Sequence, residues 1–458
     1  MRCFQSGSAR SWWSLTITSD QGFATPDELY VWVWLPGKTA PVVAGVLART
    51  PGVLDGEPVL AFAYARSYRD NPESISLFAP ELPLVAGTMD PTRPGRVTGG
   101  EFPAWRGYPS VDERSPLPVA SCLRDAAPDA WGRRVINLEL ANDPNIDLTE
   151  LTYLLHSGSN RSGALDFQTS ATEYVPRGEP ASLDQLVHAA ELIERGEPIP
   201  DDLAAAAGHG TSIGGARPKA LLEESGREFI AKFSSTTDTR PVVKAEAVGM
   251  LLARRVGIDV PDVKVVRSAG KDVLLVHRFD RTSKSTRLMV VSGLTVLGLR
   301  DGQSYYSSYA DLARAIRHPG WVDAQAQLHE LFTRLVLNVV VGNTDDHLRN
   351  HAAFWDGRSL RLTPAYDITP SPRNTMTASH AIGLTAEGQR ASQLRVARAA
   401  ASEFLLSPKA AQQIIDHVLD TTNAEWDEVC DEAQLTKVER DQLWGREIMN
   451  GYIFWDDA

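Results

Sequence analysis

Cysteine is scarce in this chain, and the few cysteines lie far apart. Cys3, Cys122 and Cys430 are odd in number and show no metal-binding spacing, which excludes a disulfide framework and a cysteine-ligated zinc site and fits a reducing cytoplasm. Basic residues are in deficit too, because the formal net charge is −12. We therefore expect no direct binding to nucleic acid unless a local basic patch or a basic partner provides it.

Long apolar runs are also lacking. The longest apolar stretch, residues 331–341, is interrupted by Thr333, Arg334 and Asn338 and is too short to cross a bilayer. Residues 1–22 contain no apolar segment of the kind that a signal peptide needs. We expect a cytoplasmic protein without membrane contact. At 458 residues, the chain is long enough for about two or three domains.

The order of predicted strands and helices indicates three parts. Residues 28–84 are rich in strand-forming residues, and the Pro- and Gly-dense segment 87–118 suggests a boundary. Later come two strand pairs with a helix between them, at residues 220–222 and 229–233, 243–256, 263–266 and 273–276. Helical patterns dominate from about Tyr309, apart from a hairpin at residues 352–355 and 360–362.

The strand, strand, helix, strand, strand order is that of a kinase-type N-lobe. We therefore predict an α+β chain with a protein-kinase-like two-lobe fold. Its expected parts are a β-rich N-terminal module over residues 1–115, an N-lobe with a phosphate loop over 116–281, and a mostly helical C-lobe over 282–458.

The strongest chemical signal is a set of three residues in the predicted C-lobe. Asn350 follows Asp345 by five positions, and Asp367 comes after the hairpin. Phosphoryl transfer needs a carboxylate to receive the attacking hydroxyl, and an amide and a second carboxylate to hold Mg²⁺. The spacing favours Asp345 over Asp346 as the catalytic acid. A solvated connecting loop would also be polar, but this one lies between an apolar helix and an apolar strand.

Lys232 is the candidate phosphate-binding lysine. Alternation along the predicted strand puts Lys232 beside Ile230 and opposite Phe229, Ala231 and Phe233. A lone lysine there is more often an edge residue, and Glu246 alone is more often a solvated acid in the first turn of a helix. Together they match the lysine–glutamate pair of kinases.

Three further segments carry weaker signals. The paired glycines Gly214 and Gly215, followed by Lys219, could approach phosphate oxygens, although the loop is neither a Walker A motif nor a G-x-G-x-x-G motif. Residues 277–281 would meet an adenine at a hinge, or else form a surface ion-pair cluster around Asp280. His347 and Arg349 could orient the loop or contact phosphates.

These segments together resemble the HipA family, serine/threonine kinases that act as toxins of bacterial type II toxin–antitoxin pairs. The resemblance is carried by residues 128–134, 212–222, 343–350 and 363–367, and Asp346 departs from it because a small residue is more common there. It implies the following site residues. Asp345 would be catalytic; Asn350 and Asp367 would bind metal; Gly214, Gly215, Lys219, Lys232, Glu246, His277, Arg278, Phe279, His347 and Tyr366 would bind nucleotide; Ser212 would be autophosphorylated.

The resemblance also implies cofactors and partners. ATP and Mg²⁺ would be required, an aminoacyl-tRNA synthetase is one possible protein substrate, and a helix-turn-helix antitoxin would connect the chain to DNA. Two alternatives stay open. One is a catalytically inactive co-repressor with a kinase fold, and the other is a small-molecule phosphotransferase.

Overall fold

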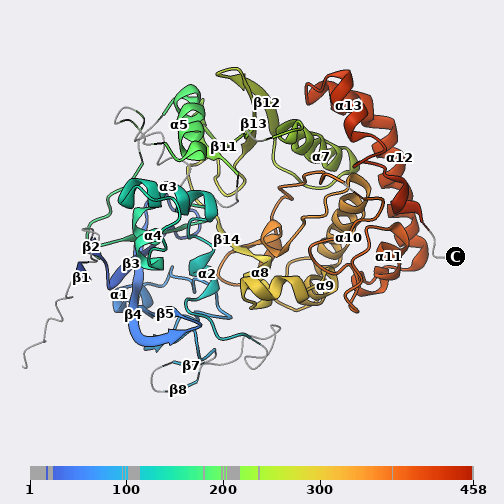
Figure 1. The fold of residues 1–458 in the computed structure, drawn as a ribbon. Helices are drawn as coiled ribbons and strands as arrows, with labels where there is room; N and C mark the ends of the chain where they lie inside the picture. Colours follow the sequence, from blue (N-terminus) through green and yellow to red (C-terminus); the bar gives the residue numbers. More distant parts are fainter. Residues whose placement is uncertain are drawn as a thin grey trace, which may run out of the picture.

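Three parts make up the molecule, as Figure 1 shows. The computed structural model describes residues 17–18, 24–94, 96–97, 100–101, 114–178, 181–197, 200, 203, 217–235, 238–373 and 375–455. A β-rich N-terminal part lies beside a small sheet with its own helices, and a helical part follows at the C-terminus. The predicted fold class is confirmed.

The N-terminal part is built on a seven-stranded antiparallel sheet of order β8-β7-β6-β5-β4-β3-β9. Its strands are β3 (Glu28–Val33), β4 (Val42–Leu54), β5 (Glu57–Tyr64), β6 (Thr88–Met89), β7 (Arg96–Val97), β8 (Gly100–Glu101) and β9 (Leu165–Gln168). A separate pair, β1 (Ile17–Thr18) and β2 (Ala24–Thr25), precedes it. Because β9 pairs with β3, this sheet contains strands from before and after residue 115. The domain boundary proposed at residue 115 stays a prediction.

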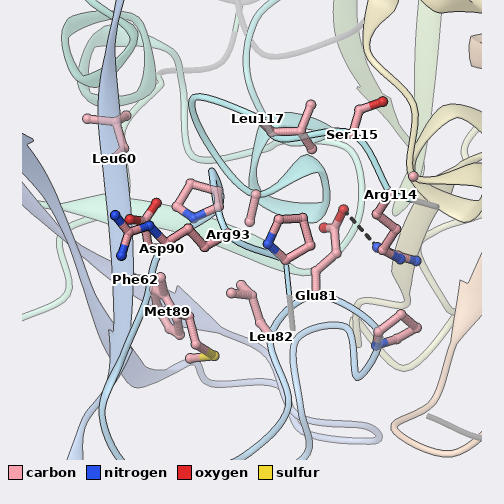
Figure 2. Close-up of a pocket in the computed structure, with 15 residues that line it drawn as sticks. Leu60, Phe62, Glu81, Leu82, Met89, Asp90, Arg93, Arg114, Ser115 and Leu117 are labelled. Atoms are coloured by element: carbon pink, nitrogen blue, oxygen red, sulfur yellow. Dashed lines mark ion pairs between the residues drawn. The ribbon is translucent and has the colours of Figure 1, made fainter. Parts of the chain in front are cut away.

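Four short helices lie in the same stretch of the chain: α1 (Arg66–Arg69), α2 (Ser121–Arg124), α3 (Ala130–Ala141) and α4 (Glu150–His156). The apolar side chains of α3, such as Trp131 and Val135, pack in the cluster of the second sheet. Figure 2 shows a small pocket beside β5, lined by apolar side chains such as Phe62, Leu82 and Met89. The Arg114–Glu81 ion pair, at 3.3 Å, lies at its edge. Its volume of about 30 Å³ suits water molecules and is too small for a cofactor.

The second sheet has the predicted strand pairs, in the order β10-β11-β13-β12. Its strands are β10 (Lys219–Glu224), β11 (Arg227–Phe233), β12 (Val263–Ser268) and β13 (Lys271–His277). Helix α5 (Leu183–Arg195) packs on one face, where Leu186 and Ile193 meet Ala231 and Phe233 in a common apolar cluster. Helix α7 (Val242–Val256) connects the two strand pairs and ends at Gly257, as the sequence predicts.

The C-terminal part is mostly helical and contains a three-stranded sheet of order β14-β15-β16. Its elements are β14 (Met289–Ser292), α8 (Gly293–Leu297), η2 (Asp301–Tyr306), α9 (Tyr309–Ile316), α10 (Ala324–Val341), η3 (Leu348–Asn350), β15 (Ala352–Trp355), β16 (Leu360–Leu362), α11 (Leu394–Ala399), η4 (Ala401–Phe404), α12 (Pro408–Glu432), α13 (Lys437–Leu443) and η5 (Gly451–Phe454). The predicted hairpin is β15–β16, and Ser407 caps α12 as expected.

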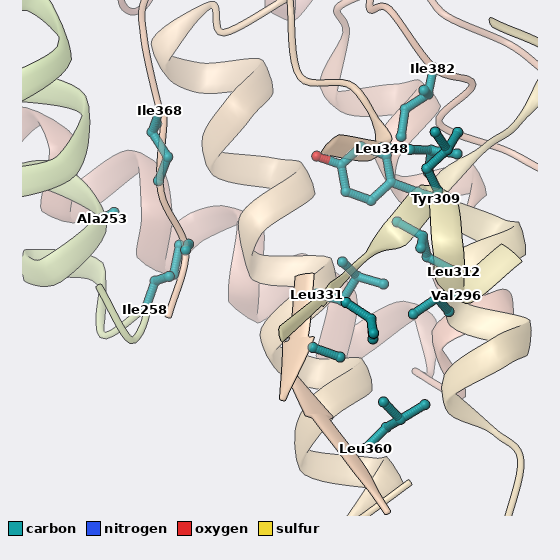
Figure 3. Close-up of a cluster of buried hydrophobic side chains, with 14 of the residues drawn as sticks. Ala253, Ile258, Val296, Tyr309, Leu312, Leu331, Leu348, Leu360, Ile368 and Ile382 are labelled. Carbon is teal, nitrogen blue, oxygen red and sulfur yellow. The ribbon is translucent and has the colours of Figure 1, made fainter. Parts of the chain in front are cut away.

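Helix α10 lies at the centre of this part. Leu331 on α10, Leu312 on α9 and Val296 on α8 are all buried in the same apolar cluster, which also contains Leu348 from the loop that follows α10 (Figure 3). That loop is therefore fixed against a packed core. Among the described residues, no helix combines the length and the apolar character that crossing a bilayer requires.

A buried ion-pair cluster joins the end of β13 to the N-terminal part. Asp280 accepts hydrogen bonds from the Arg278 guanidinium at 2.9 and 2.7 Å, from Arg281 at 3.0 Å and from the Gly163 amide at 2.7 Å. A surface ion-pair cluster is one of the two sequence interpretations of this segment, beside an adenine-binding hinge. The surface placement is wrong, because Arg278 and Asp280 are only 2% and 5% exposed. Although burial opposes it, the neighbouring guanidinium groups lower the pKa of Asp280.

We expect Asp280→Asn to lower the free energy of unfolding by about 3–5 kcal/mol at pH 7, because it leaves buried guanidinium charge uncompensated. The folded-state pKa of Asp280 is below the unfolded value. Its contribution is therefore complete above pH of about 4 and is lost as the pH falls toward the folded pKa. Urea denaturation at several pH values measures this loss. Asp441→Asn, at an exposed site on α13, is the control, and equal stability of the two variants at pH 7 would contradict the assignment.

Candidate active site

A large cleft lies where the three parts of the chain meet. Its volume is about 1140 Å³. Its wall includes the four residues that the sequence predicts to converge, namely Lys232, Asp345, Asn350 and Asp367. The N-terminal part contributes to the same wall, with side chains such as Arg49, Glu57 and Leu60.

Lys232 lines this cleft and is held by two carboxylates. Its Nζ lies 2.5 Å from Glu246 Oε1 and 2.6 Å from Asp367 Oδ1. Alternation along β11 explains the direction of the side chain, because Ala231 and Phe233 pack under α5 on the other face. Burial opposes the charge of Lys232, but the two carboxylates outweigh it and raise the pKa of the amine. Lys232 is therefore a cation at every physiological pH.

The two carboxylates that hold Lys232 differ in their electrostatics. Lys232 is the main cause that lowers the pKa of Asp367, whereas burial raises the pKa of Glu246. Asp367 also has a left-handed backbone, with φ of 61°, a conformation that non-glycine residues rarely adopt. This turn follows the β15–β16 hairpin and returns Asp367 to the cleft as an ionised carboxylate.

A glycine on α7 permits the approach that brings Glu246 and Asp367 to one lysine. A Cβ atom built on Gly249 would lie 2.1 Å from the carbonyl oxygen of Ile368, a distance that no side chain can occupy. Because Ile368 directly follows Asp367, the contact at Gly249 fixes α7 against the segment that carries this carboxylate.

The loop after α10 brings Asp345 and Asn350 to the cleft. Helix α10 ends at Gly342, where φ is 70°, and Asn350 Nδ2 donates to the Asp345 carbonyl at 3.4 Å. Asp345 is exposed, whereas Asp346 is only 3% exposed and does not line the cleft. The pKa of Asp345 is raised, mainly by burial and to a smaller extent by repulsion from Asp367 and Asp346. His347 acts in the opposite direction and lowers it. The structure therefore gives the two acids of this loop different surroundings.

The oxygen donors in the cleft suit a shared Mg²⁺ ion rather than a closed protein site. Asn350 offers an amide oxygen and Asp367 a carboxylate, and Mg²⁺ prefers a few such oxygens together with water and phosphate. Among the described residues, there is no group of three or more His, Cys, Asp or Glu side chains that could hold a metal ion. The donor set therefore fits a metal that a phosphate ligand helps to hold.

Lys219 lies beside Lys232 and has an acidic partner from another part of the chain. The two lysines are directly opposite each other in the β10–β11 register, and Lys219 Nζ is 3.1 Å from Asp129 Oδ2. Asp129 also caps α3 by accepting from the Gly132 amide. The sequence marks the segment around Asp129, but it gives no sign of this ion pair, because Lys219 is distant from Asp129 in sequence. Only the cap had a local signal.

The other predicted nucleotide-binding residues lie along the same cleft. His277, Arg278, Phe279, His347 and Tyr366 all line it. The rings of Phe279 and Tyr366 are 5.6 Å apart, and the Tyr366 hydroxyl donates to the Arg349 carbonyl at 2.7 Å. The Arg278 guanidinium donates to Asn160, to the Arg161 carbonyl and to Asp280. These bonds fix it within the protein. Ser212, Gly214 and Gly215 lie outside the described residues.

Comparison with known proteins gives a family match and a similar fold. Residues 211–426 match the family model of the HipA-like C-terminal domain. This part of the chain belongs to the HipA-like C-terminal domain family. The serine/threonine-protein kinase toxin HipA of Shewanella oneidensis is 26% identical in an alignment of 190 residues that covers 34% of this chain and 42% of that protein. Y4dM of Sinorhizobium fredii is 29% identical in an alignment of 160 residues that covers 32% of this chain and 38% of that protein.

The structural likeness extends beyond the matched domain. The chain superposes on S. oneidensis HipA, solved as a complex with HipB and operator DNA, with a TM-score of 0.63 and 17% identity, covering 91% of this chain and 96% of that one. By sequence, the chain spans less than half the length of the curated relatives that it matches. Lys232, Asp345, Asn350 and Asp367 all lie within the family-model match.

We expect Gly249→Ala to destabilise the protein by about 1–3 kcal/mol, because the added methyl group overlaps the Ile368 carbonyl. Helix propensity alone predicts the opposite sign, a gain of roughly 1 kcal/mol. Thermal unfolding measures the difference. Gly451→Ala is the control, since a Cβ atom there meets no atom within 4 Å. An unchanged or raised Tm for Gly249→Ala would contradict the close approach.

Proposed function

We propose that this chain is an ATP- and Mg²⁺-dependent protein serine/threonine kinase of the HipA toxin type. The observation that carries the proposal is the Lys232 amine, held by Glu246 and Asp367 in the cleft that Asp345 and Asn350 also line. These are the side chains that phosphoryl transfer by a kinase requires.

Each side chain has a distinct task in this proposal. The oxygen of the acceptor hydroxyl bonds to the γ-phosphorus of ATP, and Asp345 accepts the proton of that hydroxyl. The bond between the γ-phosphorus and the bridging oxygen breaks, and ADP leaves with its electrons. Lys232 neutralises phosphate oxygens. Asn350 and Asp367 would hold Mg²⁺, which supplies charge neutralisation at the phosphates. Positioning and electrostatics account for nearly all of the rate enhancement, and the raised pKa of Asp345 brings its basicity closer to the working pH.

The partners that we propose follow from family membership. S. oneidensis HipA has been solved together with HipB and operator DNA, and we infer a helix-turn-helix antitoxin as the partner of this chain. DNA would be reached through that partner, because a net charge of −12 does not favour direct binding to phosphates. The proposed substrate is a cytoplasmic protein such as an aminoacyl-tRNA synthetase.

Two other functions remain as alternatives. An inactive co-repressor would not need Lys232, Asp345, Asn350 and Asp367 to share a cleft. A small-molecule phosphotransferase would need them, but a cleft of about 1140 Å³ exceeds the usual size of a small-molecule site. The N-terminal part contributes to its wall, which supports a larger substrate.

We expect Asp345→Asn to reduce phosphate transfer by about 10²–10⁴-fold, because the acceptor hydroxyl loses its base. Radiolabelled ATP added to a host lysate, followed by identification of the labelled proteins, measures the transfer. Asp367→Asn should be equally impaired, and Asp441→Asn is the surface control. Near-normal labelling by both site variants would end the kinase proposal. Label only in small molecules would favour the phosphotransferase, and no label with wild-type protein would favour the co-repressor.

We also propose that Ser212 is autophosphorylated, with slow self-inactivation as the result. A phosphate on Ser212 would place nearly two negative charges in the loop that precedes Lys219, where the ATP phosphates are expected. Mass spectrometry after incubation with ATP should find the phosphorylated loop peptide in wild-type protein and not in Ser212→Ala or Asp345→Asn. An unmodified peptide in active wild-type protein would exclude this step.

A further inference from the structure

A buried group of polar side chains lies directly beneath the loop that carries Asp345. The Asp346 carboxylate accepts hydrogen bonds from His351 Nε2 at 2.9 Å and from the Tyr309 hydroxyl. All three side chains are buried, Tyr309 completely. Figure 3 shows the Tyr309 ring near Leu348, Ile382 and Leu312, with its hydroxyl at the edge of this apolar cluster. Asp346 is thus bound to the packed core of the C-terminal part.

The hydrogen bonds continue from Asp346 to the start of the loop. The Tyr309 hydroxyl accepts from Asn338 Nδ2 at 2.8 Å, and Asn338 Oδ1 accepts from Asn343 Nδ2 at 3.0 Å. The Asn343 amide also donates to the Asn338 carbonyl at 2.9 Å. Because Asn338 belongs to α10 and Tyr309 begins α9, two helices fix the start of the loop.

The end of the loop is fixed in the same way. The His351 ring packs edge-on against Tyr309, with ring centroids 5.2 Å apart. The His351 carbonyl accepts from the Gly293 amide, at the start of α8, at 2.6 Å. Between these two ends, Asp346 connects the middle of the loop to α9 through Tyr309 and to the end of the loop through His351.

Neighbouring residues of this loop point in opposite directions. Asp345 is exposed in the cleft, and Asp346, the next residue, is buried. A buried carboxylate is costly unless donors satisfy it, so Asp346 is stable only where Tyr309 and His351 reach it. Because the two residues share a peptide bond, this restriction also limits the directions in which Asp345 can point.

We propose that Asp346 is a positioning residue: its buried carboxylate, held by Tyr309 and His351, fixes the direction in which Asp345 faces the acceptor hydroxyl. This inference rests on the function proposed above. Asp346 itself touches no reacting atom. A small displacement of a base is enough to slow a reaction strongly, since about 1 Å of misplacement can cost on the order of 10²-fold in rate.

Kinetic measurements on three variants test this inference. Asp346→Asn should lower kcat for ATP-dependent labelling of lysate protein by about 10²-fold and leave KM for ATP within about twofold. Tyr309→Phe keeps the ring in its cluster and removes one donor, so its loss should be smaller, about tenfold. The double variant should lose no more than Asp346→Asn, because both residues act as one unit.

The matched control is Val418→Ala, which removes buried apolar volume on α12 without touching the network. It should lower the Tm, and its kcat at a temperature where it is folded should equal that of wild type. Asp346→Asn with a wild-type kcat, or with a loss no larger than that of Val418→Ala, would overturn the proposal.

A second measurement does not depend on activity. Amide hydrogen exchange in a peptide that covers residues 343–351 should become faster in Asp346→Asn and Tyr309→Phe, and should not change in Val418→Ala. Unchanged exchange in Asp346→Asn would also overturn the inference. If wild-type protein transfers no phosphate but exchange rises as expected, the proposed function fails while the anchoring of the loop stands.

Discussion

The Lys232 ammonium group, between the carboxylates of Glu246 and Asp367, is the interaction on which the rest of the site depends. The distances of 2.5 and 2.6 Å join three segments that are remote in sequence: strand β11, helix α7 and the turn after the β15–β16 hairpin. A largely buried charge is tolerated only when it is paired and hydrogen-bonded. The lysine therefore requires both carboxylates, and the two parts that carry them must approach each other.

Several features of the fold follow from this requirement. Gly249 lets α7 contact Ile368, and Asp367 adopts a left-handed backbone so that its side chain faces the lysine. Helix α5 covers the opposite face of the small sheet with apolar side chains, which leaves the cleft face to Lys219 and Lys232. Asp129, at the start of α3, pairs with the second lysine, so this helix contributes to the same charge balance.

Much of this arrangement could be predicted from local patterns. Alternation along β11 predicts that Lys232 faces away from Ala231 and Phe233, and the structure has this arrangement. The five-residue spacing favours Asp345 over Asp346 as the catalytic acid, and of the two only Asp345 lines the cleft. Such predictions are possible because side-chain direction in a strand, and spacing within a short loop, depend on nearby residues alone. The strand and helix order of the small sheet was recovered for the same reason.

Other features depend on long-range packing and left no local signal. The pairing of Lys219 with Asp129, the burial of Arg278 and Asp280, and the bond from Tyr309 to Asp346 all join residues that are far apart or whose burial depends on other elements. A surface ion-pair cluster around Asp280 is one of the two interpretations that the sequence allows. The cluster lies in the interior because Asn160, Arg161 and Gly163 supply partners from another part of the chain.

The central claim is that Lys232, Asp345, Asn350 and Asp367 form one nucleotide–metal site. A crystal structure with Mg²⁺ and a non-hydrolysable ATP analogue tests it most directly. We predict that phosphate oxygens contact Lys232, that Asn350 and Asp367 bind the metal ion, and that Asp345 faces the terminal phosphate. A nucleotide bound elsewhere, or a metal ion that contacts neither Asn350 nor Asp367, would contradict the account.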